Sequence, residues 1–367
     1  MRRTTTWTWT CVAFLAFLAA PAGGQERPRR VPETSNLLTQ YLDWADIHPP
    51  RAVGRLTIFP RALSRQVPGL GSVLTMQQAL SRGLLAIEEL DRPRVSSASF
   101  TNKSRDRMIF LMAGEMITGG RQSRTLQVDA LLGPDSTTVL PLYCVQKGRW
   151  AGGKRFGGSS GVAPQRVREM AAAKAGQEAV WSEVARANDR LKAQTDSQDL
   201  AAAMDKPETA RRLAELRAKV VPDLPRGCVG IVVAWRGRIV GADLLNSPEL
   251  FADLRDKILD SYLSQYGWPL PVRESARRPE PDVTGEQVRG YLRGCYRSRL
   301  VSGERYGVGR AYHLRGERSG HVLGYDDRVM VHTALSSPQV LPVRPVPVPL
   351  PRPRPIPRPM ESRGRTP

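Results

Sequence analysis

The strongest constraint on the fold is a series of short apolar segments, rich in β-branched residues, that fills the chain between residues 53 and 150. Turn-forming stretches such as NKSRD, GGRQS and GPDS separate the segments. These connections are too short to hold the crossover helix that parallel neighbours need. We therefore predict an antiparallel sheet or sandwich, with strands over residues 55–59, 84–90, 96–102, 108–117, 125–132 and 137–145.

Helical patterns accompany these strands. A short helix is predicted over residues 75–83, with Thr75 as its N-cap. Apolar residues then recur at three- and four-residue steps across residues 165–220, which predicts two helices, the second capped by Asp205. An amphipathic helix is predicted over residues 248–266, with a proline in its first turn.

A β-hairpin lies between these helices. Residues 228–234 and 238–244 are apolar and are joined by the two-residue turn Arg236-Gly237. Together the segments predict one α+β domain over residues 51–268, in which packed helices cover an antiparallel sheet or sandwich.

Other parts of the chain are less regular. Residues 25–50 are polar and read as a linker with one short helix at 37–45. The glycine-rich residues 152–161 predict a loop. Residues 269–338 indicate an extension of short strands or irregular structure, and residues 339–367 form a Pro/Arg-rich tail that is expected to be disordered and extended.

The amino terminus predicts export. Arg2 and Arg3 precede an apolar run over residues 11–20 and small residues at 20–22, the pattern of a signal peptide ending near residue 24. That run is shorter than the roughly 20 residues needed to span a bilayer. We expect a periplasmic or extracellular protein, without a transmembrane segment in its mature chain.

The net charge is strongly positive. It is +20 for the whole chain, and about +13 remains once the signal segment and the tail are set aside. A basic exported body suits small anionic ligands or anionic envelope polymers. Nucleic acid is disfavoured as a partner, because none of the motifs of the common nucleic-acid-binding modules is present.

Cysteine and histidine patterns predict neither a metal site nor a cofactor. Removal of the signal segment leaves three cysteines, Cys144, Cys228 and Cys295, without CxxC spacing. At most one disulfide can join two of them, and the pairing stays open. His321, His332 and the acidic pair at 326–327 match no known metal-site spacing.

Residues 114–150 contain the candidate ligand site. The segments GEMITGGRQSRTL and LPLYCVQKGRW place basic side chains beside glycine turns, where amide N–H groups and guanidinium forks suit phosphate or carboxylate. If the two turns meet in space, the ligand-binding residues are Arg121, Gln122, Arg124, Gln146, Arg149 and Trp150. The alternative is a pair of structural turns whose arginines bind backbone carbonyls or Glu115.

Two residues are candidates for catalysis. Glu115 interrupts an apolar strand, so it either pairs with Arg121 or Arg124 or acts as a general base. Cys144 is a nucleophile only if Lys147 or Arg149 lowers the pKa of its thiol, and otherwise it is a buried apolar residue.

The order of these motifs, followed by EAVWSEVA and GIVVAWRGRIVGADLL, resembles the domain family named for its association with ADP-ribosylglycohydrolases and rhodanese-type phosphatases. The resemblance spans residues 42–268. It implies that the protein is associated with ADP-ribose, nucleotide or phosphate metabolism, but the family has no established reaction. Gln146 stands where the family commonly has glutamate, so a catalytic role for that carboxylate would be absent here.

Two functions follow as expectations. The first is binding of a small phosphate-, nucleotide- or ADP-ribose-like ligand by an exported domain, with turnover left open. The second is non-catalytic adhesion, in which the basic body and the Arg-Pro tail hold anionic envelope polymers.

Overall fold

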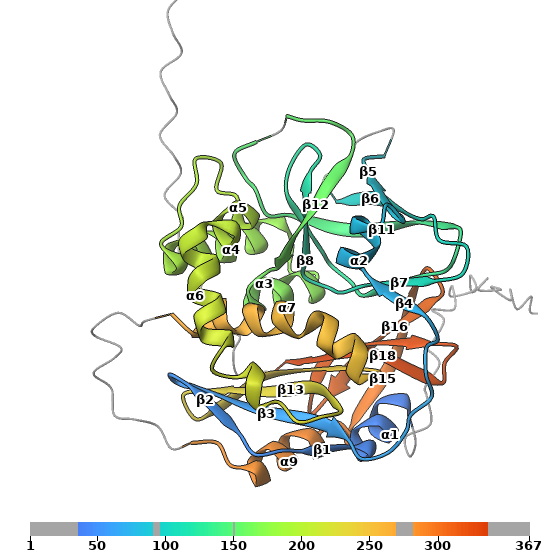
Figure 1. The fold of residues 1–367 in the computed structure, drawn as a ribbon, viewed down its shortest axis with the longest axis vertical. Coiled ribbons are helices and arrows are strands. Elements are labelled where there is room, and N and C mark those ends of the chain that lie inside the picture. Colours follow the sequence, from blue (N-terminus) through green and yellow to red (C-terminus); the bar gives the residue numbers. More distant parts are fainter. Residues whose placement is uncertain (1–35, 91–95, 150, 269–281, 337–367) are drawn as a thin grey trace, which may run out of the picture.

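The computed structural model describes residues 36–90, 96–149, 151–268 and 282–336 (Figure 1). The predicted signal segment, Trp150 and the proline-rich tail lie outside these residues. Within the described chain, no helix has the length and apolar character needed to cross a membrane.

A nine-stranded sheet, referred to as the large sheet, dominates the described chain. Its order is β1-β3-β13-β14-β18-β17-β16-β15, with β2 also paired to β3, and all of its pairs are antiparallel. The strands are β1 (Ala45–Ile47), β2 (Arg51–Val53), β3 (Leu56–Leu63), β13 (Cys228–Trp235), β14 (Arg238–Leu245), β15 (Ser298–Tyr306), β16 (Gly309–Gly316), β17 (Ser319–Tyr325) and β18 (Val329–Ser336).

Two smaller sheets come from the region between residues 73 and 162. A six-stranded antiparallel sheet has the order β12-β8-β9-β11-β6-β5, and a three-stranded sheet has the order β10-β7-β4, in which only β4 and β7 are parallel. The strands are β4 (Val73–Thr75), β5 (Leu85–Glu88), β6 (Ser97–Asn102), β7 (Met108–Leu111), β8 (Glu115–Gly119), β9 (Arg124–Leu126), β10 (Ala130–Leu132), β11 (Ser136–Cys144) and β12 (Phe156–Val162).

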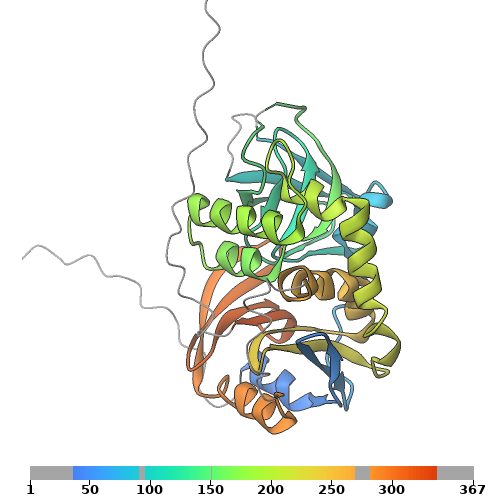
Figure 2. The ribbon, with the colours of Figure 1, turned by 90° about the vertical axis from the view of Figure 1, so that its left-hand side faces the viewer.

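Helices cover the large sheet on both faces and lie between part of it and the smaller sheets (Figures 1 and 2). α7 lies along one face, on the side of α3 to α6, while α1 and α9 lie against the other. The helices are α1 (Leu37–Trp44), α2 (Met76–Ser81), α3 (Gln165–Ala172), α4 (Gln177–Leu191), α5 (Leu200–Asp205), α6 (Pro207–Arg217), α7 (Pro248–Tyr266) and α9 (Gly285–Arg293). The predicted α+β class is confirmed.

Side-chain alternation along β13 explains the two faces. Ile231 and Val233 pack with Ile258 of α7, whereas Val232 packs with the residues of α1 and α9. Because successive residues of a strand point to opposite faces, an uninterrupted apolar run such as CVGIVVAW suits a central strand covered on both sides.

The most local predictions hold closely. α7 begins at Pro248 after the N-cap Ser247, and α2 begins after Thr75, whose side chain forms a capping box with Gln78. The β13–β14 hairpin turns at Arg236 and Gly237, where φ is +51° and +73°, the left-handed pair typical of a two-residue turn.

The structure describes residues 36–50 of the predicted linker, and they form regular elements. The helix expected at 37–45 is α1, capped by Asn36, and β1 follows it directly and pairs with β3. The Tyr41 hydroxyl donates to the Leu245 carbonyl. Apolar residues of α1 thus form part of the core against one face of the large sheet. The polar residues on either side of α1 in the sequence gave no indication of this packing.

Two predicted strands are each broken into two. The segment 108–117 divides into β7 and β8 at Gly114, where φ is +89°. A Cβ at Gly114 would lie only 2.2 Å from the Arg168 side chain, so the turn requires glycine. The segment 125–132 divides into β9 and β10 around Asp129, whose carboxylate accepts from the Ala113 N–H at 2.7 Å.

The expected loop at 152–161 is wrong in its second half, because β12 pairs with β8 from residue 156 onward. Two register shifts interrupt this pairing. Glycine allows the close approach, since a Cβ at Gly119 would lie 2.7 Å from the Gly157 nitrogen.

Residues 165–220 form four helices instead of two. Gly176, with φ of +92°, precedes α4, and Asp199 caps α5. Asp205 is the last residue of α5, so the predicted cap is wrong: α6 begins at Pro207 after Lys206, without a side-chain cap.

The segment beyond residue 268, for which short strands or irregular structure were the two expectations, contributes α9 and four strands of the large sheet. Its glycines mark close contacts between strands: a Cβ at Gly320 would lie 2.3 Å from the Ala334 carbonyl oxygen. Glycines and arginines interrupt the apolar alternation there, which concealed the strands in the sequence.

Candidate functional site

Glu115 is fully buried and is paired, although its partner is not an arginine. Its Oε1 lies 2.7 Å from the Lys257 Nζ of α7, and its Oε2 accepts from the Met112 N–H at 2.9 Å. The expected pairing of Glu115 with Arg121 or Arg124 is therefore wrong. The pair with Lys257 fastens the β7–β8 turn to α7, which is a structural role.

Arg124 is also fully buried and faces Glu89. Its Nη2 donates to both oxygens of the Glu89 carboxylate, at 2.7 and 2.9 Å, and its Nη1 donates to the Ser97 carbonyl. The guanidinium also lies over the Phe156 ring. Arg121 is half-buried nearby, and its backbone N–H donates to the same Glu89 carboxylate.

The two predicted turns do meet, around Gln146. Its Oε1 accepts from the Ser123 N–H and from the Arg149 Nε, both at 3.0 Å, and its backbone carbonyl accepts from the Gln122 amide. The Arg149 fork donates onward to the carbonyls of Ala151 and Gly119. Many of the N–H groups that were predicted to bind a ligand thus donate to other groups of the protein. The ligand role of the predicted residues stays a prediction.

Cys144 is buried, and burial raises the pKa of its thiol. The Sγ donates to the Gln146 carbonyl at 2.9 Å. Cys228 and Cys295 are likewise buried and free among the described residues. A raised pKa disfavours the thiolate, so the geometry supports the interpretation of Cys144 as a buried apolar residue and not as a nucleophile.

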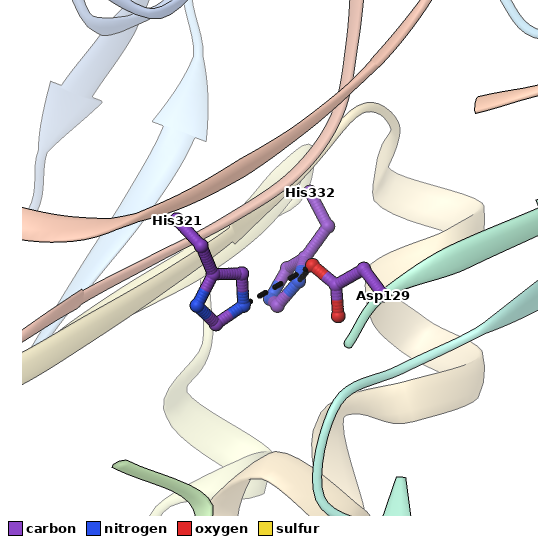
Figure 3. A group of neighbouring side chains, drawn as sticks. All are labelled: Asp129, His321 and His332. Carbon is purple, nitrogen blue, oxygen red and sulfur yellow. Dashed lines mark hydrogen bonds and ion pairs between the residues drawn. The ribbon is translucent and has the colours of Figure 1, made fainter. Parts of the chain in front are cut away.

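A different cluster of ionisable groups lies between the large sheet and the smaller ones. It is centred on His332, which is fully buried in β18. The His332 Nδ1 lies 2.7 Å from the Asp129 Oδ2, and its Nε2 lies 3.1 Å from the Asp243 Oδ1. Figure 3 shows this contact with Asp129 and the His321 ring beside it, whose Nε2 is 3.2 Å from the same carboxylate oxygen.

Sheet register explains how these groups meet. Ala334 of β18 pairs with both Asp243 of β14 and His321 of β17, and His332 lies two residues before Ala334. Residues two apart on a strand share a face. His313 of β16 lies next to this row of residues, because it pairs with His321. The residues thus lie side by side on the face that is also packed by α3 and α7.

Asp243 is held by three partners. The Arg168 guanidinium of α3 donates to both of its oxygens, at 2.6 and 3.3 Å, and the Tyr262 hydroxyl of α7 donates at 2.7 Å. Burial opposes the ionised form, but Arg168 and His332 outweigh it and hold the pKa of Asp243 well below its usual range. The buried pair is therefore fully charged.

His332 is charged for the same reason. Burial alone would lower the pKa of His332, yet the carboxylates of Asp129 and Asp243 outweigh it and raise that pKa to about 9. Two carboxylates, one guanidinium and one imidazolium then balance in charge. This balance makes the burial of four ionised groups tolerable.

The cluster borders a cavity of about 310 Å³ between α3 and strands β16 to β18. Arg168, Asp243 and Tyr262 form part of its wall, while His321 is half-buried and Arg315 is exposed at it. The remaining polar lining residues are Gln165, Glu169, His313, Ser319 and Ser336. Burial raises the pKa of the Glu169 carboxyl to about 7.

Sequence reasoning missed this site. His321 and His332 were grouped in sequence with the acidic pair at 326–327, a spacing that matches no known metal site. Asp327 instead accepts from the Arg310 Nε at 3.0 Å. The carboxylates that contact His332 belong to Asp129 and Asp243, about 200 and 90 residues away along the chain. The available signal was an acidic residue inside the apolar run GADLL, which is rare unless the charge is paired.

One family model matches the chain, over residues 45–335: the ARG and Rhodanese-Phosphatase-superfamily-associated Protein domain, ARPP-1. The match agrees with the resemblance found in the motifs, but it continues past residue 268 and takes in the four C-terminal strands that carry His321 and His332. No curated protein and no solved structure matches the chain.

Proposed function

We propose that this chain, which belongs to the ARG and Rhodanese-Phosphatase-superfamily-associated Protein domain family, binds a small anionic ligand of the phosphate, nucleotide or ADP-ribose class. The single observation that carries the proposal is the cavity beside α3, which is lined by arginine, imidazole and hydroxyl groups. Pockets of this size with a few convergent polar groups are the usual sites for small ligands.

The charges around the cavity favour an anion. Arg168 is neutralised by Asp243, which leaves Arg315 as the positive charge that faces a ligand. His313 and His321 line the same cavity as hydrogen-bonding imidazoles, and burial lowers the pKa of His313. The opposing acid is Glu169, whose pKa near 7 keeps a substantial fraction of it neutral at physiological pH. An arginine fork pairs well with phosphate oxygens.

Replacement of Arg315 by alanine is expected to weaken binding of ADP-ribose or inorganic phosphate about tenfold, because one charge-assisted contact is lost. Calorimetric titration of the full chain measures this. Arg149→Ala is the matched comparison, since it removes an arginine from the turns predicted by the sequence. If wild type and Arg315→Ala bound the ligand equally well and Arg149→Ala did not bind it, the ligand site would lie at those turns and not in the cavity.

Binding of a permanently charged anion such as sulfate is expected to weaken as the pH rises through about 7. Glu169 then loses its proton, and its negative charge repels the ligand. Burial lowers the pKa of His313, so its imidazole loses its charge at lower pH than this. Glu169→Gln should therefore remove only the part of the decline around and above pH 7. A profile that Glu169→Gln leaves unchanged would show that Glu169 does not face the ligand.

We also propose that the protein is exported, which rests on the basic start, the apolar run and the small residues at 20–22. Amino-terminal sequencing of the protein recovered from outside the cytoplasm is the test. A start between residues 23 and 25 is expected, and a mature protein that retains Met1 would count against cleavage.

A further inference from the structure

Three potential metal ligands converge beside the cavity. The Asp129 Oδ2, the His332 Nδ1 and the His321 Nε2 all lie within 4.8 Å of one another. The carboxylate oxygen lies 2.7 Å from the His332 nitrogen and 3.2 Å from the His321 nitrogen. The cluster is drawn in Figure 3.

These distances are close to those around a bound ion. Nitrogen and oxygen ligands at about 2.0–2.1 Å from a tetrahedral or octahedral centre lie roughly 2.8–3.4 Å from each other. The Asp129 oxygen already lies near this separation from both imidazoles.

The surrounding contacts orient the ligands as a metal site requires. The Nε2 of His332 faces the Asp243 carboxylate, so the Nδ1 is left to face Asp129 and His321. Asp243 is itself fixed by Arg168 and Tyr262. Metal-binding histidines commonly donate their second ring N–H to a carboxylate, which sets the tautomer and the ring orientation.

Asp129 is oriented in the same manner. Its Oδ1 accepts from the Ala113 N–H at 2.7 Å, which directs the Oδ2 toward the two imidazoles. This contact joins the β9–β10 turn to the β7–β8 turn. Both turns thus place the carboxylate against the large sheet.

The cluster has access to solvent on one side. His332 and Asp129 are buried, whereas His321 is half-buried and lines the cavity. An ion held by three protein ligands would keep an open position. His321 borders the cavity, and its Nε2, which would hold the ion, is itself buried against Asp129.

We propose that Asp129, His321 and His332 bind one divalent first-row transition-metal ion, such as Zn²⁺, with Asp243 as the residue that positions His332. Two imidazoles and a carboxylate suit this class of ion better than Ca²⁺ or Mg²⁺, which prefer oxygen ligands alone. Binding displaces the proton on the His332 Nδ1 to solvent, and the Nε2 proton stays on the Asp243 contact. The proposal does not depend on the anionic ligand.

The test uses the full chain with Zn²⁺ and Co²⁺ alone. After chelator treatment and desalting, calorimetry with Zn²⁺ should give one site per chain, and Co²⁺ should give visible absorption bands from bound ligands. His321→Ala should weaken Zn²⁺ binding at least 100-fold, because one of three ligands is lost. Asp243→Asn should weaken it about 10- to 100-fold.

His48→Ala is the matched control, since His48 lies between β1 and β2 and is outside the cluster. It should bind Zn²⁺ within threefold of wild type. Far-UV circular dichroism of each variant confirms folding. Absence of Zn²⁺ binding in the wild type, or equal binding by wild type and His321→Ala, would overturn the proposal. A failure to bind phosphate would leave this titration unaffected.

Discussion

Replacement of Asp243 by asparagine is expected to lower the free energy of unfolding by about 3–5 kcal/mol, the range measured when one partner of a buried ion pair is removed. Asp243 is fully buried and accepts from Arg168, Tyr262 and His332. The amide keeps the shape of the side chain but leaves the Arg168 guanidinium without its counter-ion. Denaturant unfolding in the presence of a chelator, so that metal binding does not contribute, measures the change.

Asp326→Asn is the control for this substitution. Asp326 is exposed in the β17–β18 turn with φ of +51°, a conformation that asparagine tolerates. Its effect should stay within about 0.5 kcal/mol. If Asp243→Asn were equally mild, the buried network would not hold the large sheet to α3 and α7, and the account of this cluster would be wrong.

The second large effect is expected at Arg124. Its replacement by methionine, which keeps much of the apolar length, should cost about 3–5 kcal/mol because the Glu89 carboxylate is left buried without its partner. The side chains of both residues are inaccessible to solvent. Equilibrium unfolding of Arg124→Met gives the value.

A double-mutant cycle separates the ion pair from simple loss of packing. Glu89→Gln combined with Arg124→Met should be less destabilised than the sum of the two single variants, because neither buried charge remains. Additive effects would mean that the two side chains do not act as a pair. An Arg124→Met protein that is fully stable yet fails to bind phosphate would instead restore the ligand role predicted for Arg124.

Elements with local signals could be predicted from the sequence. α7 was bounded correctly because Ser247 and Pro248 begin it and an apolar stripe continues to Tyr266. The β13–β14 hairpin followed from a two-residue turn containing glycine. β12 was not predicted, because its glycines remove the side-chain pattern that identifies a strand.

The candidate site could not be predicted, because it depends on register and on distant turns. The Asp129 turn meets His332 from about 200 residues away, and Asp243 reaches the same ring from the opposite side. Neither contact leaves a spacing that a motif search would find. The wrong partner predicted for Glu115 has the same cause. The arginines near it in sequence were the candidates, but the residue that lies next to it in the fold is Lys257 of α7.

The arrangement of the turns at 114–150 could be predicted only in part. The sequence predicted a shared site for Gln122, Gln146 and Arg149 on the condition that the two glycine turns meet, and in the structure they do meet. What it could not specify was where the donors point. Arg149 donates to backbone carbonyls, and Arg124 turns inward to Glu89.

A crystal structure of the full chain soaked with ADP-ribose would show where the ligand binds. The proposed function predicts ligand density in the cavity beside α3, with the phosphates within hydrogen-bonding distance of Arg315 and near His321. Density at the turns around Arg121 and Arg149, or an empty cavity at saturating ligand, would contradict it.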